Sequence, residues 1–366
     1  MPKLTVLDHH TVYRNADPNL RSEYVAFPAI QALPDDSLLC MCRHGVARES
    51  DDGIVLIHRS TDGGATWQPA GALPEPAGVA EGSALPGGFG LCPSGAVLAW
   101  ARYPCGTGDE SGQIVWRSSD GGLGWSQPTR VATTPFGRIG VGGNLVTMAD
   151  GTMISVSEWG GPDRRDGRPQ WVALLSRSTD DGRSWSQWVR VHESDDDLYY
   201  FDLRATGLPD GRLLAVYWTH DMEKDEGVNV HTAWSSDQGE TWTAPQDAGF
   251  WGQVTDIASL QSGRVLAVTN HRREPLGIRA VLSEDGGKRF AEDEHVEVWG
   301  IDPARVRSAP VLAKQRDLVE DVLDSYHFFT FGTPSITQLS DGVIVVAFYV
   351  TEEQVTYVRC CRMREF

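Results

Sequence analysis

The sequence predicts an all-β protein built from repeats of one structural unit, on two observations. The first is an eight-residue pattern, S-x-D-x-G-x-x-W, which occurs five times, at Ser60, Ser118, Ser178, Ser235 and Ser283, with Phe290 in place of the last Trp. Its aspartates lie at 62, 120, 180, 237 and 285, a slowly varying period typical of blades or solenoid units. The second is a series of Asp/Ser-Gly turn signals between short apolar runs, as expected of antiparallel strands.

The repeated pattern has a local physical meaning. Its Asp carboxylate can accept hydrogen bonds from the backbone N–H groups that follow it, which closes an Asx-type turn. The Gly tolerates the positive φ that such a turn needs, and the aromatic residue can bury itself between neighbouring sheets. We therefore predict a structural role for all five copies, because repeats of this kind build scaffolds.

The pattern resembles the Asp box of the sialidase (neuraminidase) superfamily of β-propellers, and the resemblance covers roughly residues 20 to 362. It implies a propeller, in which each blade contributes one turn between its first and second strands. Six such turns are present, at Pro34–Ser37, Ser94-Gly95, Asp150-Gly151, Asp210-Gly211, Ser262-Gly263 and Asp341-Gly342. We therefore expect a six-bladed β-propeller of the sialidase type.

The strands can be assigned in order along the chain. Residues 3–13 form a strand without a blade of its own, so we expect this N-terminal strand to close the last blade. The first blade is predicted to contain strands at 24–33, 37–43 and 54–60. The last blade begins near Gly332 and continues through strands at 343–349 and 355–363. We expect one domain over residues 1–366, with the longest insertion at about 302–328.

The composition limits the partners. The 39 Gly and 20 Pro fit many short strands joined by turns, and the net charge of −18 argues against a nucleic-acid partner. The six cysteines, at 40, 42, 92, 105, 360 and 361, have no metal-binding spacing, so we expect free thiols, no metal and no cofactor. No apolar run reaches the length of a signal peptide or a membrane span, which predicts a cytoplasmic protein without a membrane partner.

The propeller geometry selects candidate site residues. The start of each inner strand and the end of each second strand meet at one mouth of the central channel, whereas the repeated motifs lie on the far side. We predict catalytic residues among Asp51, Glu49, Asp202, His220 and His271. We predict substrate-binding residues among Arg43, Arg102, Glu158, Tyr199, Arg204, Trp251, Asp256, Arg272 and Arg273. A polar channel that merely holds water is the alternative.

The resemblance can be compared with the sequence residue by residue. Sialidases open their first blade with Arg-Ile-Pro, where this chain has Ala26-Phe27-Pro28. They place a Tyr nucleophile at the start of the last inner strand, supported by a Glu from the fourth blade. Thr333 and Asp202 stand at these two positions here. The strand that ends in Arg43 and the segment 271–279 do match sialidase-like proteins, and the acidic loop 49–52 lies where that family keeps its acid/base Asp. The resemblance therefore implies a sialidase fold without sialidase chemistry.

Three functions remain open. The first is a glycoside hydrolase with non-sialidase specificity, in which two carboxylates flank the glycosidic bond. The second is a lyase on uronic acid sugars, with His220 or His271 as base and Arg204, Arg272 or Arg273 on the carboxylate. The third is a non-catalytic glycan-binding propeller that uses Trp159, Trp218 and Trp251 as platforms. All three predict a carbohydrate or small glycoside as the partner, and none predicts an oligomeric state.

Overall fold

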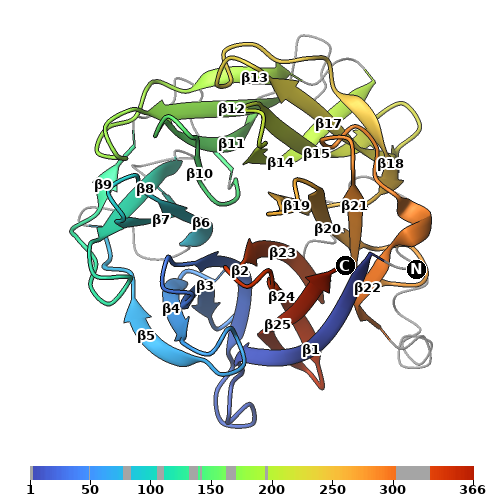
Figure 1. Cartoon of the computed structure of the whole chain (residues 1–366). Helices are drawn as coiled ribbons and strands as arrows, with labels where there is room; N and C mark the ends of the chain where they lie inside the picture. Colours follow the sequence, from blue (N-terminus) through green and yellow to red (C-terminus); the bar gives the residue numbers. More distant parts are fainter. Residues whose placement is uncertain are drawn as a thin grey trace.

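The structure is a computed structural model of the 366-residue chain. It describes residues 3–48, 50–76, 84–104, 111–131, 139–140, 142–161, 170–193, 197–301 and 330–366. Antiparallel sheets are arranged around a central axis, and β2, β6, β10, β14, β19 and β23 lie nearest to it (Figure 1). The expected all-β propeller arrangement is therefore confirmed.

The strands are short and follow one another around the ring. The first sheet in the chain contains β2 (Tyr24–Ala32), β3 (Leu38–Gly45), β4 (Ile54–Ser60) and β5 (Gln68–Ala72). The next contains β6 (Leu85–Leu91), β7 (Val97–Pro104), β8 (Ser111–Ser118) and β9 (Thr129–Arg130). It is followed by β10 (Val146–Thr147), β11 (Met153–Gly161), β12 (Gln170–Ser178) and β13 (Val189–Glu193).

The second half of the ring repeats this order. One sheet contains β14 (Leu198–Gly207), β15 (Leu213–Asp221), β17 (Asn229–Ser235) and β18 (Gln246–Trp251), with β16 (Glu226–Gly227) beside β15. Another contains β19 (Thr255–Ser259), β20 (Val265–His271), β21 (Gly277–Ser283) and β22 (Val296–Gly300). The last strands are β23 (Phe331–Gln338), β24 (Ile344–Glu352) and β25 (Val355–Glu365). The short 3₁₀ helix η1 (Glu292–Glu294) precedes β22, and no helix in the described residues could cross a bilayer.

Hydrogen bonding corrects the expected division into six separate blades. Four sheets stand alone as blades, whereas the strands predicted for the first and last blades share one eight-stranded sheet. They are joined by a parallel contact of β2 with β25, at Tyr24 and Thr356. The physical reason is that inner strand β2 approaches the neighbouring sheet closely enough to form a backbone pair. Sequence patterns that set strands and turns do not report such a pair.

The N-terminal strand closes the ring. Strand β1 (Leu4–Tyr13) pairs antiparallel with β25 along nearly its whole length, from Leu4 opposite Glu365 to Tyr13 opposite Val358. Figure 1 shows the blue N-terminal strand beside the red C-terminal strand. The guanidinium of Arg362 binds the carboxylate of Asp8 through two hydrogen bonds, of 2.7 and 2.5 Å. The chain ends are thus held together by backbone pairing and by a bidentate ion pair.

The repeated motif makes the turn expected of it. In the first copy, Asp62 accepts hydrogen bonds from the backbone N–H of Thr66 and from the hydroxyls of Ser60 and Thr66, at 2.6 to 2.9 Å. Ser60 in turn accepts the N–H of Gly64, whose φ is +89°. These bonds hold the pKa of the Asp62 carboxyl down at about 2, mainly because they favour its charged form. The prediction of a structural role agrees with this geometry.

The core lies between neighbouring sheets. Leu39 and Met41 of β3 pack in one cluster with Phe89 of β6 and Trp116 of β8, all fully buried. Five cysteines, at 40, 42, 92, 360 and 361, are buried free thiols, as predicted, and Cys105 lies outside the described residues. The predicted insertion at 302–328 also lies outside them.

Candidate functional site

Three inner strands carry the same irregularity at the channel mouth. In β2, β14 and β23, two residues stand opposite one residue of the next strand, which is the signature of a bulge. The first of the two residues has positive φ in each case: Phe27 at 54°, Asp202 at 50° and Thr333 at 43°. Positive φ costs energy in residues with a side chain, and such positions cluster at functional sites. Three separate strands therefore present strained residues around one mouth.

The channel below this mouth is narrow. A cavity of about 30 Å³ is lined by residues that include Phe27, Gly143, Arg204, Asp256 and Thr333. The hydroxyl of Thr333 is buried here without a hydrogen-bond partner among the described residues. A space of this size holds only water. The cavity itself is therefore too small for an organic substrate.

Two carboxyl groups meet at the mouth. Glu158, near the end of β11, accepts on Oε2 the backbone N–H of Asp202 at 2.6 Å and the indole N–H of Trp171 at 3.0 Å. Burial, and next the nearby charge of Asp202, raise the pKa of Glu158 to about 8. Burial also raises the pKa of Asp202, against the opposing charges of Arg204, Arg272 and Arg48. The pair thus retains a proton near neutral pH, and we place it on Glu158, because the three arginines favour the charged form of Asp202.

Arg204 lies between Asp202 and a third carboxyl group. Its Nη2 atom is 4.0 Å from Oδ1 of Asp202, and its side chain is 8% exposed. Its charge also lowers the pKa of Asp256, which burial nonetheless raises to about 6. Oδ2 of Asp256 accepts the backbone N–H of Ile336 at 2.8 Å. Arg204 and Asp256 therefore lie beside Asp202 and line the small cavity, and their role in substrate binding stays a prediction.

Two further arginines stack on aromatic rings around the same site. The guanidinium carbon of Arg272 lies 5.2 Å from the ring centre of Phe331, and Arg272 donates a hydrogen bond of 2.6 Å to the Phe331 carbonyl. The guanidinium carbon of Arg48 lies 5.3 Å from the ring centre of Phe27. Both charges act on Asp202 and oppose the rise of its pKa that burial causes. Sequence reasoning selected Arg272 but missed Arg48.

Trp171, Tyr24 and Tyr349 were also missed. The ring centres of Tyr24 and Tyr349 are 6.4 Å apart. Both phenols interact electrostatically with the positive charges of Arg48 and Arg272. Burial raises the pKa of both phenols. Trp171 is the second residue of β12, the third strand of its sheet, and the propeller rule considers only first and second strands. A rule extended to the starts of third strands would have included it.

A second group of predicted residues lies together in a cluster of its own. His271 donates from Nδ1 to the carbonyl of Arg273 at 2.9 Å, and its Nε2 accepts from Arg279 at 2.9 Å. Burial and the charge of Arg279 lower the pKa of His271. The guanidinium carbon of Arg273 lies 4.5 Å from the ring centre of Trp251. The side chains of Arg273 and Trp251 both donate hydrogen bonds to the carbonyl of Gly227. Both nitrogens of His271 are thus engaged, which argues against its predicted role as a base.

Other predicted residues have structural contacts. Arg43 is fully buried and donates to the carbonyls of Ala47 and Ser50, so it supports the loop after β3. His220 pairs with Asp225 at 3.1 Å, and Tyr199 is buried opposite it. Arg102 lies on β7 opposite Leu85 of β6. Asp51 is exposed on the loop after β3, and Glu49 of the same loop lies outside the described residues.

The structure also places the positions that were compared with sialidases. Ala26 is fully buried between strands, and Thr333 occupies the start of the last inner strand. Tyr326, the one residue in the insertion that could replace the missing nucleophile, lies outside the described residues. Within the described part of the chain, no group of three His, Cys, Asp or Glu side chains gathers to hold a metal.

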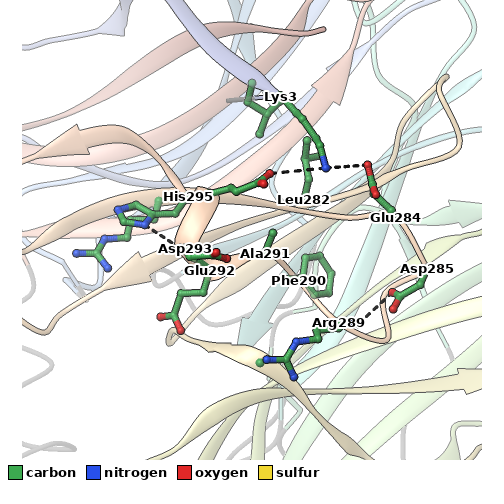
Figure 2. Close-up of a pocket in the computed structure, with 14 residues that line it drawn as sticks. Lys3, Leu282, Glu284, Asp285, Arg289, Phe290, Ala291, Glu292, Asp293 and His295 are labelled. Carbon is green, nitrogen blue, oxygen red and sulfur yellow. Dashed lines mark hydrogen bonds and ion pairs between the residues drawn. The ribbon is translucent and has the colours of Figure 1, made fainter. Parts of the chain in front are cut away.

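A larger cavity, of about 980 Å³, shares no lining residue with the small cavity at this mouth. Figure 2 shows the residues that line it. It is lined by residues of η1, the N-terminal strand and the fifth repeated motif. Lys3 lies between Glu284 and Glu294, at 2.9 and 3.7 Å, and Asp285 accepts the N–H groups of its own turn. Because these charged groups already have partners within the protein, the cavity is a weaker candidate than the mouth.

The family model for the BNR repeat-like domain matches residues 89–346 of this chain. A sialidase from Bacteroides fragilis is 30% identical over 127 residues, which cover 33% of this chain and 23% of the relative. A xyloglucanase from Hypocrea jecorina is 26% identical over 324 residues, which cover 80% of this chain and 36% of the relative. The chain thus spans about a quarter to a third of the length of these curated relatives.

Solved structures show the same fold. A Dyadobacter fermentans protein of unknown function superimposes with a TM-score of 0.75 and 18% identity, and the match covers 100% of both chains. An α-L-arabinanase from Penicillium chrysogenum, complexed with arabinobiose, gives a TM-score of 0.68 and 15% identity over 98% of both chains. At these identities the likeness shows the fold alone.

Proposed function

The chain belongs to the family of BNR repeat-like domain proteins, within the sialidase-like propellers, and from this premise we propose that it is a glycosidase with non-sialidase specificity. The observation that carries the proposal is the Glu158–Asp202 pair at the channel mouth, joined by a 2.6 Å hydrogen bond from the Asp202 backbone. A protonated and an ionised carboxyl group in one site are what glycoside hydrolysis requires.

The two groups would divide the work according to their surroundings. Glu158, with a pKa of about 8, holds a proton at neutral pH and donates it to the glycosidic oxygen as the C–O bond breaks. Asp202 stabilises the positive charge that develops on the sugar ring, while Arg204 and Arg272 keep it ionised. Water then adds to the anomeric carbon, and its proton returns to a carboxylate, which completes the hydrolysis.

The relatives support a carbohydrate as the substrate class. The names of the matched proteins include a sialidase, a xyloglucanase and an arabinanase with a bound arabinobiose. Sialosides themselves are disfavoured, because Ala26 and Thr333 replace the arginine and the tyrosine that the sialidase resemblance requires. We therefore propose a neutral or uronic sugar as substrate.

The test is a screen of aryl glycosides and oligosaccharides of neutral and uronic sugars. Turnover should fall by about 10²-fold or more in Glu158→Gln and in Asp202→Asn, because proton donation and charge stabilisation are lost. The exposed Glu353→Gln is the matched control and should keep full activity. Activity should also decline as the pH rises through about 8, as Glu158 loses its proton. Turnover that survives Glu158→Gln would place the chemistry elsewhere, and glycan binding without turnover would indicate a binding propeller.

A uronate lyase is the second candidate, and the ring of arginines around Asp202 favours it. Arg48, Arg204 and Arg272 could neutralise a substrate carboxylate and so acidify the adjacent C5 proton. Asp202 would take this proton as the base, the C4–O bond would break as Glu158 gives a proton to the departing oxygen, and a C4=C5 double bond would form without water. Lyase products absorb ultraviolet light as unsaturated sugars and hydrolase products do not, so one spectrum of the reaction mixture separates the two reactions.

A further inference from the structure

We propose that Trp171 both positions Glu158 and forms the binding platform for the sugar on the leaving-group side of the bond. The proposal rests on the proposed function, since it assigns a subsite next to the same acid. It names the ligand there as a neutral sugar ring, bound by its apolar C–H face.

Trp171 is held in one orientation by three neighbours. Its indole Nε1 donates to Oε2 of Glu158 at 3.0 Å, and its ring centre lies 4.9 Å from that of Phe201, in an edge-to-face arrangement. It pairs across the sheet with Gly160, where a Cβ atom would lie only 2.5 Å from the ring. The side chain nevertheless remains half-buried, so part of the ring still faces solvent. A fixed, partly exposed indole is suited to receive a flat ligand face.

The place of the ring beside the acid identifies its ligand. A general acid must reach the glycosidic oxygen, so the group attached to that oxygen leaves past Glu158. Trp171, which touches Glu158, therefore meets the departing sugar. Phe201, which is partly exposed and whose ring centre lies 5.3 Å from that of the buried Trp218, continues the aromatic surface on that side. Arg48 follows β3 and Arg272 follows β20, which belong to other sheets of the ring than Trp171 and Phe201. Because these two positive charges reach Asp202 from other sheets, the aromatic side suits a neutral sugar.

Substitutions can separate the two tasks of Trp171. Trp171→Phe keeps an aromatic ring but removes the N–H, which normally lowers the pKa of Glu158. We expect the pH at which activity declines on the alkaline side to rise by about 0.5–1 unit, while KM stays within about twofold of the wild-type value. Trp171→Leu removes the ring as well, and KM for the disaccharide identified by the glycoside screen should rise by about tenfold.

Gly160→Ala tests the platform without changing any aromatic or acidic group. Its new methyl group must displace the Trp171 ring, so KM for the same disaccharide should rise as in Trp171→Leu. Gly207→Ala is the matched control, because a Cβ there has ordinary contacts at 3.5 and 3.6 Å, and it should change nothing.

The decisive substrate is the glycosyl fluoride of the same non-reducing sugar. Fluoride leaves with little acid assistance and occupies no sugar subsite, so Trp171→Leu should hydrolyse it at nearly the wild-type rate. An equal loss on the fluoride and the disaccharide would overturn the proposal and reduce Trp171 to a structural residue. If the wild type turns over no glycoside, the proposed hydrolysis fails. In that case, weaker binding of Trp171→Leu to immobilised neutral oligosaccharides would still support the platform, and unchanged binding would reject it.

Discussion

The replacement of Glu158 by Gln should make the protein more stable, and increasingly so as the pH rises. Gln keeps an oxygen that can accept the N–H groups of Asp202 and Trp171, but it cannot ionise. Below about pH 4.5 the wild-type carboxyl group is protonated in both the folded and unfolded states. Above that pH the unfolded chain releases the proton while the folded protein retains it, so the wild type loses stability until about pH 8.

The size of the effect follows from the same shift. A rise of the pKa of Glu158 from 4.5 to about 8 sets an upper limit of about 5 kcal/mol, at about 1.4 kcal/mol per pKa unit. Part of this comes from the charge of Asp202, so we expect a smaller gain from Glu158→Gln in an Asp202→Asn background. The double-mutant comparison therefore measures how strongly the two carboxyl groups interact.

The assay is urea denaturation of both proteins at intervals between pH 4 and pH 9. The free energy of unfolding of Glu158→Gln should exceed that of the wild type by more than about 1 kcal/mol at pH 8, and the difference should shrink toward pH 4.5. Glu353→Gln, at a 75%-exposed carboxylate, should differ from the wild type by less than about 0.5 kcal/mol at every pH. A difference for Glu158→Gln that does not vary with pH would refute the buried, protonated carboxyl group.

Three further predictions concern the scaffold and the specificity. Asp62→Ala should destabilise the protein by about 1–2 kcal/mol at pH 7, because three hydrogen bonds of the first repeated motif are lost. The loss should shrink only as the pH falls from about 4 toward 2, where the wild-type carboxylate itself protonates. Val12→Ala, in the closing strand β1, should cost about 1–3 kcal/mol in urea denaturation, whereas Leu7→Ala, at a 45%-exposed site, should cost less than about 0.5 kcal/mol. Equal effects would mean that β1 is not part of the core. Release of the aryl group from an aryl sialoside should be undetectable, and efficient release that Tyr326→Phe abolishes would show that the insertion supplies a nucleophile.

The sequence by itself determined the scaffold, because the signals that encode it are local. The strand predicted at 54–60 matches β4, and the strand predicted at 3–13 pairs with the chain's end as expected. The turns and the Ser-Asp-Gly hydrogen bonds join residues two to four positions apart, so a local sequence motif predicts them directly.

The tertiary structure decided which of the predicted polar residues come together at the mouth. Glu158 and Asp202 are 44 residues apart and come from different sheets, and Trp171 reaches Glu158 from a third-strand position that the rule for the mouth does not cover. Arg43 and His271 stand at positions that predicted function, yet the loop after β3 and Arg279 engage them. The direction of a side chain at a strand end depends on how the following loop folds back. The fold of that loop depends on packing between distant segments, which the periodicity of the strands does not predict.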